Sequence, residues 1–324
     1  MSELLEFNNY SMGFRDDDGN VINMLDRVTF SVKEGKAIGI VGESGCGKSM
    51  TSLSIMRLLP KSAVVQGGEI LYRGYNLLTL SDREIEEIRG RDISMIFQEP
   101  MTSLNPVLTI GFQIGEVLHR HHPEFTKEQV KEAVIEQLRM VGIPNPEKRF
   151  GQYPHQFSGG MRQRVMIAMA TICHPTILIA DEPTTALDVT IQAQVLDLMS
   201  KLKVNGSLML ITHNLGIVAE ICDEVVVMYA GRVVESGWMA EIFDHPCHPY
   251  TVGLMAAIPT LTYDKKELYS IPGVVPISRN FLPGCRFAPR CAHAMPHCAT
   301  ELPPTRKISQ NHLVNCWLDF EKGA

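Results

Sequence analysis

Short apolar runs separated by turns dominate the first hundred residues of the chain. Residues 28–32 alternate between apolar and polar positions, and after a turn at 33–36 residues 37–41 form a continuous apolar run. Alternation is typical of a strand with one buried face, whereas a short continuous run is typical of a strand that is buried on both faces. We therefore predict strands at these two places, and two similar runs predict strands at 67–72 and 93–97.

The middle of the chain has a different period. Between about residues 109 and 140, Val130, Val134 and Leu138 recur at helical spacing with charged residues between them, which is typical of an amphipathic helix. Strand and helix signals alternate again over 177–234. Because strands that alternate with helices form mostly parallel sheets covered on both faces, we predict an α/β fold in which the helical segment is an inserted subdomain.

The C-terminal part of the chain is rich in proline, which excludes long helices and central strands. Ten prolines lie between residues 246 and 304, and four of the chain's eight cysteines lie between 285 and 316. We predict two domains: residues 1–245, with a helical subdomain at about 100–170, and a Pro/Cys-rich domain at 246–324. In a reducing cytosol, such a group of cysteines is more typical of a metal site than of disulfides.

Composition narrows the class of protein. The 324 residues carry a formal net charge of −6, with 45% hydrophobic and 20% charged residues, which is ordinary for a folded protein and argues against binding to nucleic acid. No segment reaches the roughly 18 apolar residues that span a membrane, and the first residues lack the pattern of a signal peptide. We expect a cytoplasmic protein that meets the cell membrane only through a partner, as a peripheral protein on the cytoplasmic face.

A glycine-rich motif follows the strand predicted at 37–41. Residues 42–49 read GESGCGKS, which fits the phosphate-binding pattern G-x-x-x-x-G-K-S/T, and a helix-compatible run to residue 59 comes next. Glycines let the backbone wrap around phosphates, and the helix N-terminus adds positive charge. Lys48 would contact the β- and γ-phosphates, and Ser49 would ligate Mg²⁺. The residues expected to bind ATP here are Gly42, Ser44, Gly45, Cys46, Gly47, Lys48, Ser49 and Met50.

Two carboxylates end another apolar run, at 176–180. Asp181 and Glu182 follow it directly, and acids at the end of a buried strand are costly unless they bind something. Beside a phosphate-binding loop, Asp181 would hold Mg²⁺ through its water shell, and Glu182 would polarise the attacking water as general base. The pair is a weak signal alone and a strong one together with residues 42–49.

A third motif carries a family resemblance. Residues 157–164 read FSGGMRQR, which resembles the signature motif of the ATP-hydrolysing subunits of ABC transporters, with methionine where glutamine is commonest. A serine at this place can cap a helix whose first N–H groups would bind phosphate. The resemblance implies that the motif binds the γ-phosphate held by a second ATPase subunit, through Ser158, Gly159, Gly160, Met161 and Gln163.

The same resemblance assigns further positions. Gln98 matches the loop glutamine that senses Mg²⁺ and touches the membrane partner, and Asp188 ends a TALD segment that resembles the family's D-loop. His213 matches the switch histidine that contacts the γ-phosphate, and Phe14 resembles the aromatic residue that stacks on adenine, with Tyr10 as the alternative. The family therefore implies catalytic roles for Lys48, Gln98, Glu182 and His213, and Mg²⁺ ligands at Ser49, Gln98 and Asp181.

The resemblance covers residues 1 to about 245 and implies a P-loop ABC ATPase fold with a RecA-like mixed sheet as its core. Two positions depart from the family pattern. Asn214 follows the switch histidine where aspartate is usual, and Met50 stands where a hydroxyl residue is common. Neither departure removes a catalytic group, so we expect at most a change in rate or in phosphate contacts.

Three features are similar to the ATPases of dipeptide and oligopeptide importers in particular. They are residues 97–106 (FQEPMTSLNP), the Met161 form of the signature and residues 243–251 (FDHPCHPYT). This similarity implies a subunit that works as a homodimer or paralogous heterodimer with integral membrane permeases and, indirectly, an extracytoplasmic substrate-binding protein. Close relatives import nickel or other metal chelates, so such a cargo stays an alternative.

The C-terminal cysteines also resemble those of these importers. Their spacing, Cys285-x5-Cys291-x6-Cys298-x17-Cys316, is wider than the paired spacing of most structural zinc sites, and four thiolates can hold a 4Fe–4S cluster. We favour the cluster, in a structural role, with zinc or free thiols as alternatives. The competing functions are a soluble ABC ATPase that acts on nucleic acid or ribosomes, and a redox regulator built around the cysteines.

Overall fold

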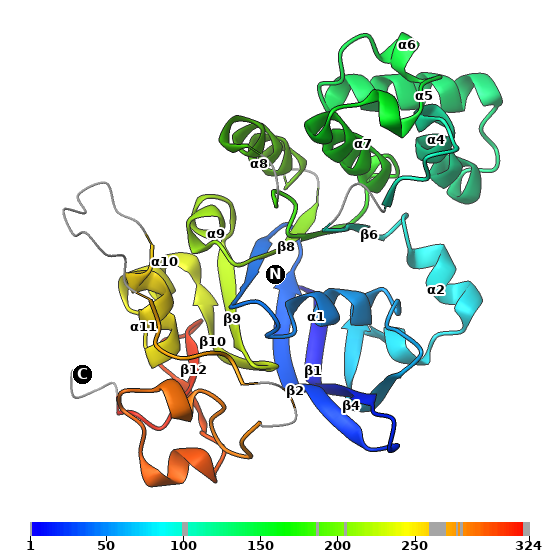
Figure 1. Cartoon of the computed structure of the whole chain (residues 1–324). Coiled ribbons are helices and arrows are strands. Elements are labelled where there is room, and N and C mark those ends of the chain that lie inside the picture. Colours follow the sequence, from blue (N-terminus) through cyan, green and yellow to red (C-terminus); the bar gives the residue numbers. More distant parts are fainter. Residues whose placement is uncertain are drawn as a thin grey trace. The chain divides into compact units, whose positions relative to one another are not determined.

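The computed structural model describes residues 2–98, 103–185, 188–203, 206–258, 270–276, 278 and 281–319. The chain divides into two compact units, the first formed by Met1–Thr79 with Ile211–Ala324 and the second by Leu80–Leu210. In Figure 1 the second unit runs from cyan to light green, and the first contains the blue and the yellow-to-red segments. None of the described helices is long and apolar enough to cross a lipid bilayer.

The first unit contains an antiparallel sheet with the strand order β2-β1-β4-β5. Its strands are β1 (Glu3–Arg15), β2 (Val21–Lys33), β4 (Ala63–Tyr72) and β5 (Tyr75–Asn76). Phe7 in β1 pairs with Phe30 in β2, and their rings stack at 4.7 Å between centroids. The strands predicted at 28–32 and 67–72 lie within β2 and β4. β1 was not predicted, because Asn8 and Asn9 interrupt its apolar alternation.

The other sheet of this unit is mixed, and its strands follow the order β11-β12-β10-β9-β3. They are β3 (Ala37–Val41), β9 (Glu224–Tyr229), β10 (Arg232–Trp238), β11 (Thr305–Lys307) and β12 (Leu313–Asn315). β3 is buried at every position and runs parallel to β9, as its continuous apolar run predicts. β10 is antiparallel to β9 and pairs with β12 as well, so residues close to the C-terminus extend the sheet.

The helices of the first unit are short. They are α1 (Lys48–Ile55), α9 (Leu215–Ile221), α10 (Met239–Asp244) and α11 (Pro249–Ala256), with 3-10 turns at Leu77–Thr79, Ala288–Arg290 and Pro296–Ala299. α1 ends before residue 59, because Arg57 takes a left-handed backbone conformation with φ 48°. Among the described residues after 256, helical structure is limited to such turns, as the proline content predicts.

The second unit combines parallel strands with a group of helices. β6 (Ile93–Ile96) pairs in parallel with β7 (Ile177–Asp181), and both strands are fully buried. The helices are α2 (Asp82–Ile88), α4 (Ile110–His121), α5 (Lys127–Met140), α6 (Pro146–Arg149), α7 (Gly159–Thr171) and α8 (Val189–Lys203), with a 3-10 turn at Pro154–Gln156. β8 (Ser207–Thr212) leads from this unit into the first.

Helices α4 to α7 form one group, in which α4 and α5 both pack against α7 (Figure 1). The helical pattern predicted from about 109 to 140 corresponds to two helices, α4 and α5. α5 begins after Thr126, whose hydroxyl accepts a hydrogen bond from the Gln129 N–H while the Gln129 side chain accepts one from the Thr126 N–H. This reciprocal cap starts a new helix. Val130, Val134 and Leu138 are buried on α5, as their spacing predicts.

Candidate nucleotide-binding site

The glycine-rich loop at 42–47 connects β3 to α1 in the first unit. Gly47 caps α1 with φ 100°, and a Cβ atom at this position would collide with Leu25. Gly42 lies so close to the carbonyl of Met228 that a side chain would collide there as well. The loop therefore requires glycine both for its conformation and for its packing. It leads directly into a helix N-terminus, which attracts anions.

Lys48 is the first residue of α1 and is only 6% exposed. Its Nζ donates hydrogen bonds to the carbonyl oxygens of Gly42 and Glu43, at 2.7 and 3.1 Å. The ammonium group is thus held against the loop, where a phosphate would meet it. Burial raises the pKa of the neighbouring Cys46 thiol, so this cysteine stays neutral beside Lys48.

The remaining loop residues are more accessible. Ser44 and Gly45 are exposed between the buried ends of the loop, and Ser49 and Met50 are half-buried in the first turn of α1. A ligand can therefore reach the loop from the side of its exposed residues.

Two other candidates lie in the first unit. Phe14 in β1 is half-buried, whereas Tyr10, the alternative adenine-stacking residue, is fully buried in the sheet. This burial favours Phe14, whose ring keeps surface that a base can reach. His213 is exposed directly after β8, and Asn214, which departs from the family pattern, caps helix α9 with its side chain.

In the second unit, the carboxylate pair and Gln98 lie at one edge of the parallel strands. Asp181 ends β7 and is 4% exposed, and Glu182 follows it with φ 49°. Gln98 is exposed just after β6. Because β6 and β7 run parallel in register, their carboxyl ends lie at the same edge. The Thr185 hydroxyl donates a hydrogen bond to Glu182 Oε2 at 2.8 Å, which helps to orient the Glu182 carboxylate.

The signature segment begins helix α7, as the sequence predicts. The Ser158 hydroxyl accepts a hydrogen bond from the Met161 N–H at 3.3 Å and caps the helix. Gly159 has open space beside its Cα, whereas a Cβ atom on Gly160 would press on Ile191. Because these glycines have no side chains to cover them, the N–H groups in the first turn of α7 are accessible to an anion.

Gln163, from the same motif, faces the interior. It is 2% exposed and donates a hydrogen bond to the carbonyl of Pro183 at 2.7 Å, which ties α7 to the segment after β7. Asp188 caps α8, because its Oδ1 accepts a hydrogen bond from the Ile191 N–H at 3.0 Å. The other predicted D-loop residues, 186–187, and residues 99–102 of the segment after Gln98 lie outside the described residues.

The two units divide the predicted residues between them. The first contains residues 42–50, Phe14, His213 and the four C-terminal cysteines, and the second contains Gln98, residues 158–163, Asp181, Glu182 and Asp188. Within each unit, the structure brings together what the motifs predict: the loop with α1 in the first, and Gln98 with the carboxylates at the strand ends in the second.

The four C-terminal cysteines line one cavity, together with apolar side chains that include Phe287 and Trp317. The Cys285 N–H donates a hydrogen bond to the carbonyl of Cys298 at 2.6 Å, which folds the segment back on itself. Burial raises the pKa of Cys285 to about 11, and the charges of the other three thiols act in the same direction. Burial also raises the pKa of Cys291 and of Cys316.

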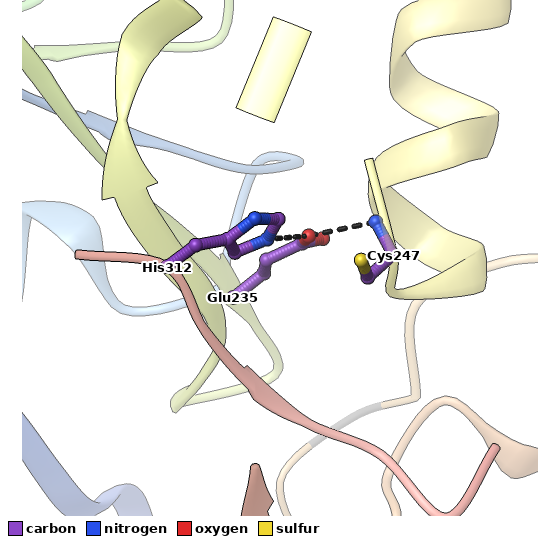
Figure 2. A group of neighbouring side chains, drawn as sticks. All are labelled: Glu235, Cys247 and His312. Carbon is purple, nitrogen blue, oxygen red and sulfur yellow. Dashed lines mark hydrogen bonds and ion pairs between the residues drawn. The ribbon is translucent and has the colours of Figure 1, made fainter. Parts of the chain in front are cut away.

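Figure 2 shows another group of potential metal ligands, Glu235, Cys247 and His312, whose ligand atoms lie within 4.8 Å of one another. Glu235 is fully buried, and its carboxylate accepts hydrogen bonds from the N–H groups of Cys247 and His248, at 2.7 and 2.9 Å. His312 Nε2 lies 2.7 Å from the same carboxylate. Because protein groups already engage both oxygens, we interpret the group as a link between β10, the start of α11 and the segment before β12.

No sequence motif marks the residues that contact the glycine-rich loop from outside. The Glu43 carboxylate is paired with Arg290, and the Glu43 N–H donates to the Tyr250 hydroxyl. The available signal was indirect: Tyr250 lies in the segment similar to peptide importers, and Arg290 precedes Cys291.

The class of the chain follows from its similarity to known proteins. Residues 25–185 match the family described as ABC transporter, and residues 234–298 match the family described as oligopeptide/dipeptide transporter, C-terminal region. The fold is similar to a dimeric structure of a post-hydrolysis state of the ATP-binding cassette MJ0796 bound to ADP and Pi. The TM-score is 0.65 and the identity 26%, covering 73% of this chain and 99% of that one. These matches confirm the predicted P-loop ABC ATPase fold.

Relatives along the whole chain identify it more closely. The dipeptide transport ATP-binding protein DppD of Bacillus subtilis (strain 168) is 50% identical over 325 residues, which cover 99% of this chain and 96% of the relative. The oligopeptide transport ATP-binding protein OppD of the same organism is 49% identical over 322 residues, covering 98% of this chain and 89% of the relative. The chain therefore belongs to the ATP-binding proteins of ABC transporters, as its motifs indicate, and it is an ATPase.

Proposed function

We propose that this ATPase powers an importer of dipeptides or oligopeptides. The observation that carries the proposal is the presence, in one chain, of the ABC transporter region at 25–185 and the oligopeptide/dipeptide transporter C-terminal region at 234–298. Relatives that match nearly the whole chain are dipeptide and oligopeptide transport ATP-binding proteins. Their names favour peptides over nickel chelates as the cargo.

The first unit would bind the nucleotide. The N–H groups of the loop at 42–47 and of the first turn of α1 would surround the phosphates. Lys48 would leave its carbonyl partners and neutralise the charge of the β- and γ-phosphates. Phe14 would stack on adenine, and His213 would contact the γ-phosphate.

The hydrolytic step would depend on oxygen ligands and on one base. Ser49, Gln98 and Asp181 offer a hydroxyl, an amide and a carboxylate, which are the hard oxygen donors that Mg²⁺ prefers. Mg²⁺ held by these residues would supply positive charge that stabilises the phosphates. Glu182 would accept a proton from the attacking water, with its carboxylate oriented by the Thr185 hydroxyl.

The chain would work in an assembly on the cytoplasmic face of the cell membrane. A second copy or a paralogue would bind the γ-phosphate through its signature residues, Ser158, Gly159, Gly160 and Met161, with Gln163 and Asp188 supporting the contact. Integral membrane permeases would carry the peptide, delivered by an extracytoplasmic substrate-binding protein. Residues 1–245, with the helical subdomain at about 100–170, would form the nucleotide-binding domain, and residues 246–324 the C-terminal domain.

The test of this function uses the chain reconstituted with its membrane subunits. We expect Glu182→Gln to bind ATP but to hydrolyse it at least about a hundredfold more slowly, because the general base is lost. Glu132→Gln, on an exposed position of α5, should leave the rate unchanged. Near-normal hydrolysis by Glu182→Gln would refute the assignment of the base, and uptake of nickel chelates but not of dipeptides would refute the cargo.

We further propose that Cys285, Cys291, Cys298 and Cys316 hold a 4Fe–4S cluster. Four thiols around one cavity with apolar walls are the ligand set that such a cluster takes. Because burial raises the pKa of three of these thiols, cluster binding would release protons.

Metal analysis of protein purified without oxygen tests this proposal. We expect about four irons and four sulfides per chain, with broad absorbance in the visible range. Cys298→Ser should lose most of the iron, whereas Cys173→Ser, in the second unit, should keep it. Stoichiometric zinc, or no metal, would overturn the proposal and leave the ATPase assignment in place.

A further inference from the structure

Glu43 is the second residue of the glycine-rich loop, and the C-terminal region holds it from two sides. Its carboxylate accepts two hydrogen bonds from the Arg290 guanidinium, Nη1 to Oε2 at 2.6 Å and Nη2 to Oε1 at 3.0 Å. Its backbone N–H donates to the Tyr250 hydroxyl at 2.8 Å. All three residues belong to the first unit, so these contacts lie within one compact body.

Arg290 is firmly supported in this position. Its side chain is 5% exposed, and its Nε and Nη2 also donate to the carbonyl oxygens of Pro272 and Ile271, at 2.8 and 3.1 Å. The hydrogen bonds to Glu43 raise the pKa of Arg290, so the guanidinium stays charged. A buried, forked guanidinium fixes both the place and the orientation of a carboxylate.

Tyr250 is supported equally well. It is fully buried, and its ring packs edge-on against Tyr229 at 4.7 Å between centroids and tilted against Phe287 at 5.4 Å. Its hydroxyl is therefore fixed by packing before it accepts the hydrogen bond from Glu43.

Glu43 links Arg290 and Tyr250 to Lys48. Its carbonyl oxygen accepts a hydrogen bond from Lys48 Nζ at 3.1 Å. Its carboxylate, N–H and carbonyl thus each have a partner, and two of the three partners come from the C-terminal region. A loop that is held in one conformation before the nucleotide arrives loses less conformational entropy on binding.

We propose that Arg290 and Tyr250 are positioning residues of the nucleotide site, which makes the C-terminal region of this chain part of its ATP-binding machinery. The inference rests on the proposed role of residues 42–49 in binding the phosphates. Arg290 and Tyr250 act through Glu43, not by contact with the nucleotide. Without either contact, the loop also adopts conformations that do not bind phosphate. The apparent affinity for the nucleotide then falls in proportion to the fraction of molecules whose loop remains in the binding conformation.

Titration of the purified full-length chain with a fluorescent ATP analogue, mant-ATP, in the presence of Mg²⁺ tests the inference. We expect Arg290→Met and Tyr250→Phe each to raise the Kd for mant-ATP by about tenfold, as for a loop that is competent about a tenth of the time. In the reconstituted complex, KM for ATP should rise while kcat at saturation stays within about twofold, since the competent state itself is unchanged. Arg290→Lys should recover part of the affinity.

Matched variants separate a positioning role from a purely structural one. Lys33→Met removes another half-buried ion pair of the first unit, with Glu224, and should leave the affinity unchanged. Combining Glu43→Arg with Arg290→Glu should restore binding relative to each single variant. Wild-type affinity in folded Arg290→Met and Tyr250→Phe would overturn the inference. Undiminished binding by Lys48→Ala would instead overturn the proposed role of residues 42–49.

Discussion

His248 is buried at the start of α11, where its Nδ1 accepts a hydrogen bond from the Tyr250 N–H at 3.1 Å. A ring nitrogen that accepts a hydrogen bond carries no proton, so the cap requires the neutral imidazole. Burial lowers the pKa of His248 to about 4, although the charge of Glu235 acts in the opposite direction. At the scale of the residue, this histidine caps a helix only while it stays uncharged.

The protein should therefore lose stability in mild acid. The pKa of histidine in an unfolded chain is about 6.5, so between that pH and about 4 the unfolded chain binds the proton and the folded chain does not. The neutral state of His248 contributes fully to the free energy of unfolding above about pH 6.5. As the pH falls towards 4, this contribution is lost, which lowers the free energy of unfolding by up to roughly 3 kcal/mol. Urea unfolding across this range measures it. His248→Asn, which keeps an acceptor but does not titrate, should flatten the dependence; an equal slope in the variant would refute the assignment.

Four of the described helices of the second unit, α2, α4, α5 and α7, begin at hydroxyl caps, and only the cap of α7 belongs to a nucleotide motif. The Thr126 hydroxyl accepts a hydrogen bond at the start of α5, and the Ser158 hydroxyl accepts one at the start of α7. The two caps stabilise their helices in the same way, because each accepts a hydrogen bond from an N–H group that has no partner within the helix. What distinguishes Ser158 is the pair of glycines after it, which leaves the first turn of α7 accessible.

A comparison of the two caps separates stability from catalysis. We expect Thr126→Ala and Ser158→Ala each to lower the free energy of unfolding by about 1 kcal/mol. In the reconstituted transporter, only Ser158→Ala should also lower the ATPase rate, because its helix contacts the γ-phosphate in the proposed function. Chemical denaturation and steady-state phosphate release measure the two effects. Equal ATPase rates in the two variants would count against a role for α7 in the site.

In the tertiary structure, buried polar links join the C-terminal residues to the rest of the first unit. A register shift in β10 between Val233 and Glu235 accompanies the burial of the Glu235 carboxylate, and such a bulge re-aims a side chain. The carboxylate then connects residues close to His248 and His312 (Figure 2). Asp26 forms a similar link with Arg232 and Arg286. Although burial opposes its ionisation, the hydrogen bond and charge of Arg232 hold the pKa of Asp26 below its usual range.

Removal of the Glu235 carboxylate should destabilise the first unit strongly. We expect Glu235→Ala to lower the free energy of unfolding by about 3 kcal/mol, because His312 and two backbone N–H groups would be left buried without their partner. Glu235→Gln keeps an acceptor oxygen and should cost less. Glu69→Ala, at an exposed position of β4, should change it by no more than about 0.5 kcal/mol. Thermal unfolding measures all three, and an unchanged midpoint for Glu235→Ala would refute the link.

Much of the candidate site was predictable from local sequence. The glycines at 42 and 47, Lys48 and the pair Asp181-Glu182 follow from short-range chemistry, since a phosphate loop needs particular backbone conformations immediately before a helix. The periodic burial of α5 and the continuous burial of β3 were equally visible, because burial repeats with the period of each element. The start of α5 was missed, because a cap is a matter of single side chains rather than of period.

The class of the protein, its nucleotide motifs and most of its buried strands could be predicted from the sequence, because these depend on the conformation of neighbouring residues. The contacts between distant groups are visible only in the folded chain. Glu43 and Arg290 are 247 positions apart, and Glu235 and His312 are 77 apart. No local sequence pattern indicates the partner of a buried charge, because that partner depends on which segments the sheets bring side by side. The contact of the C-terminal region with the glycine-rich loop is a property of the folded chain.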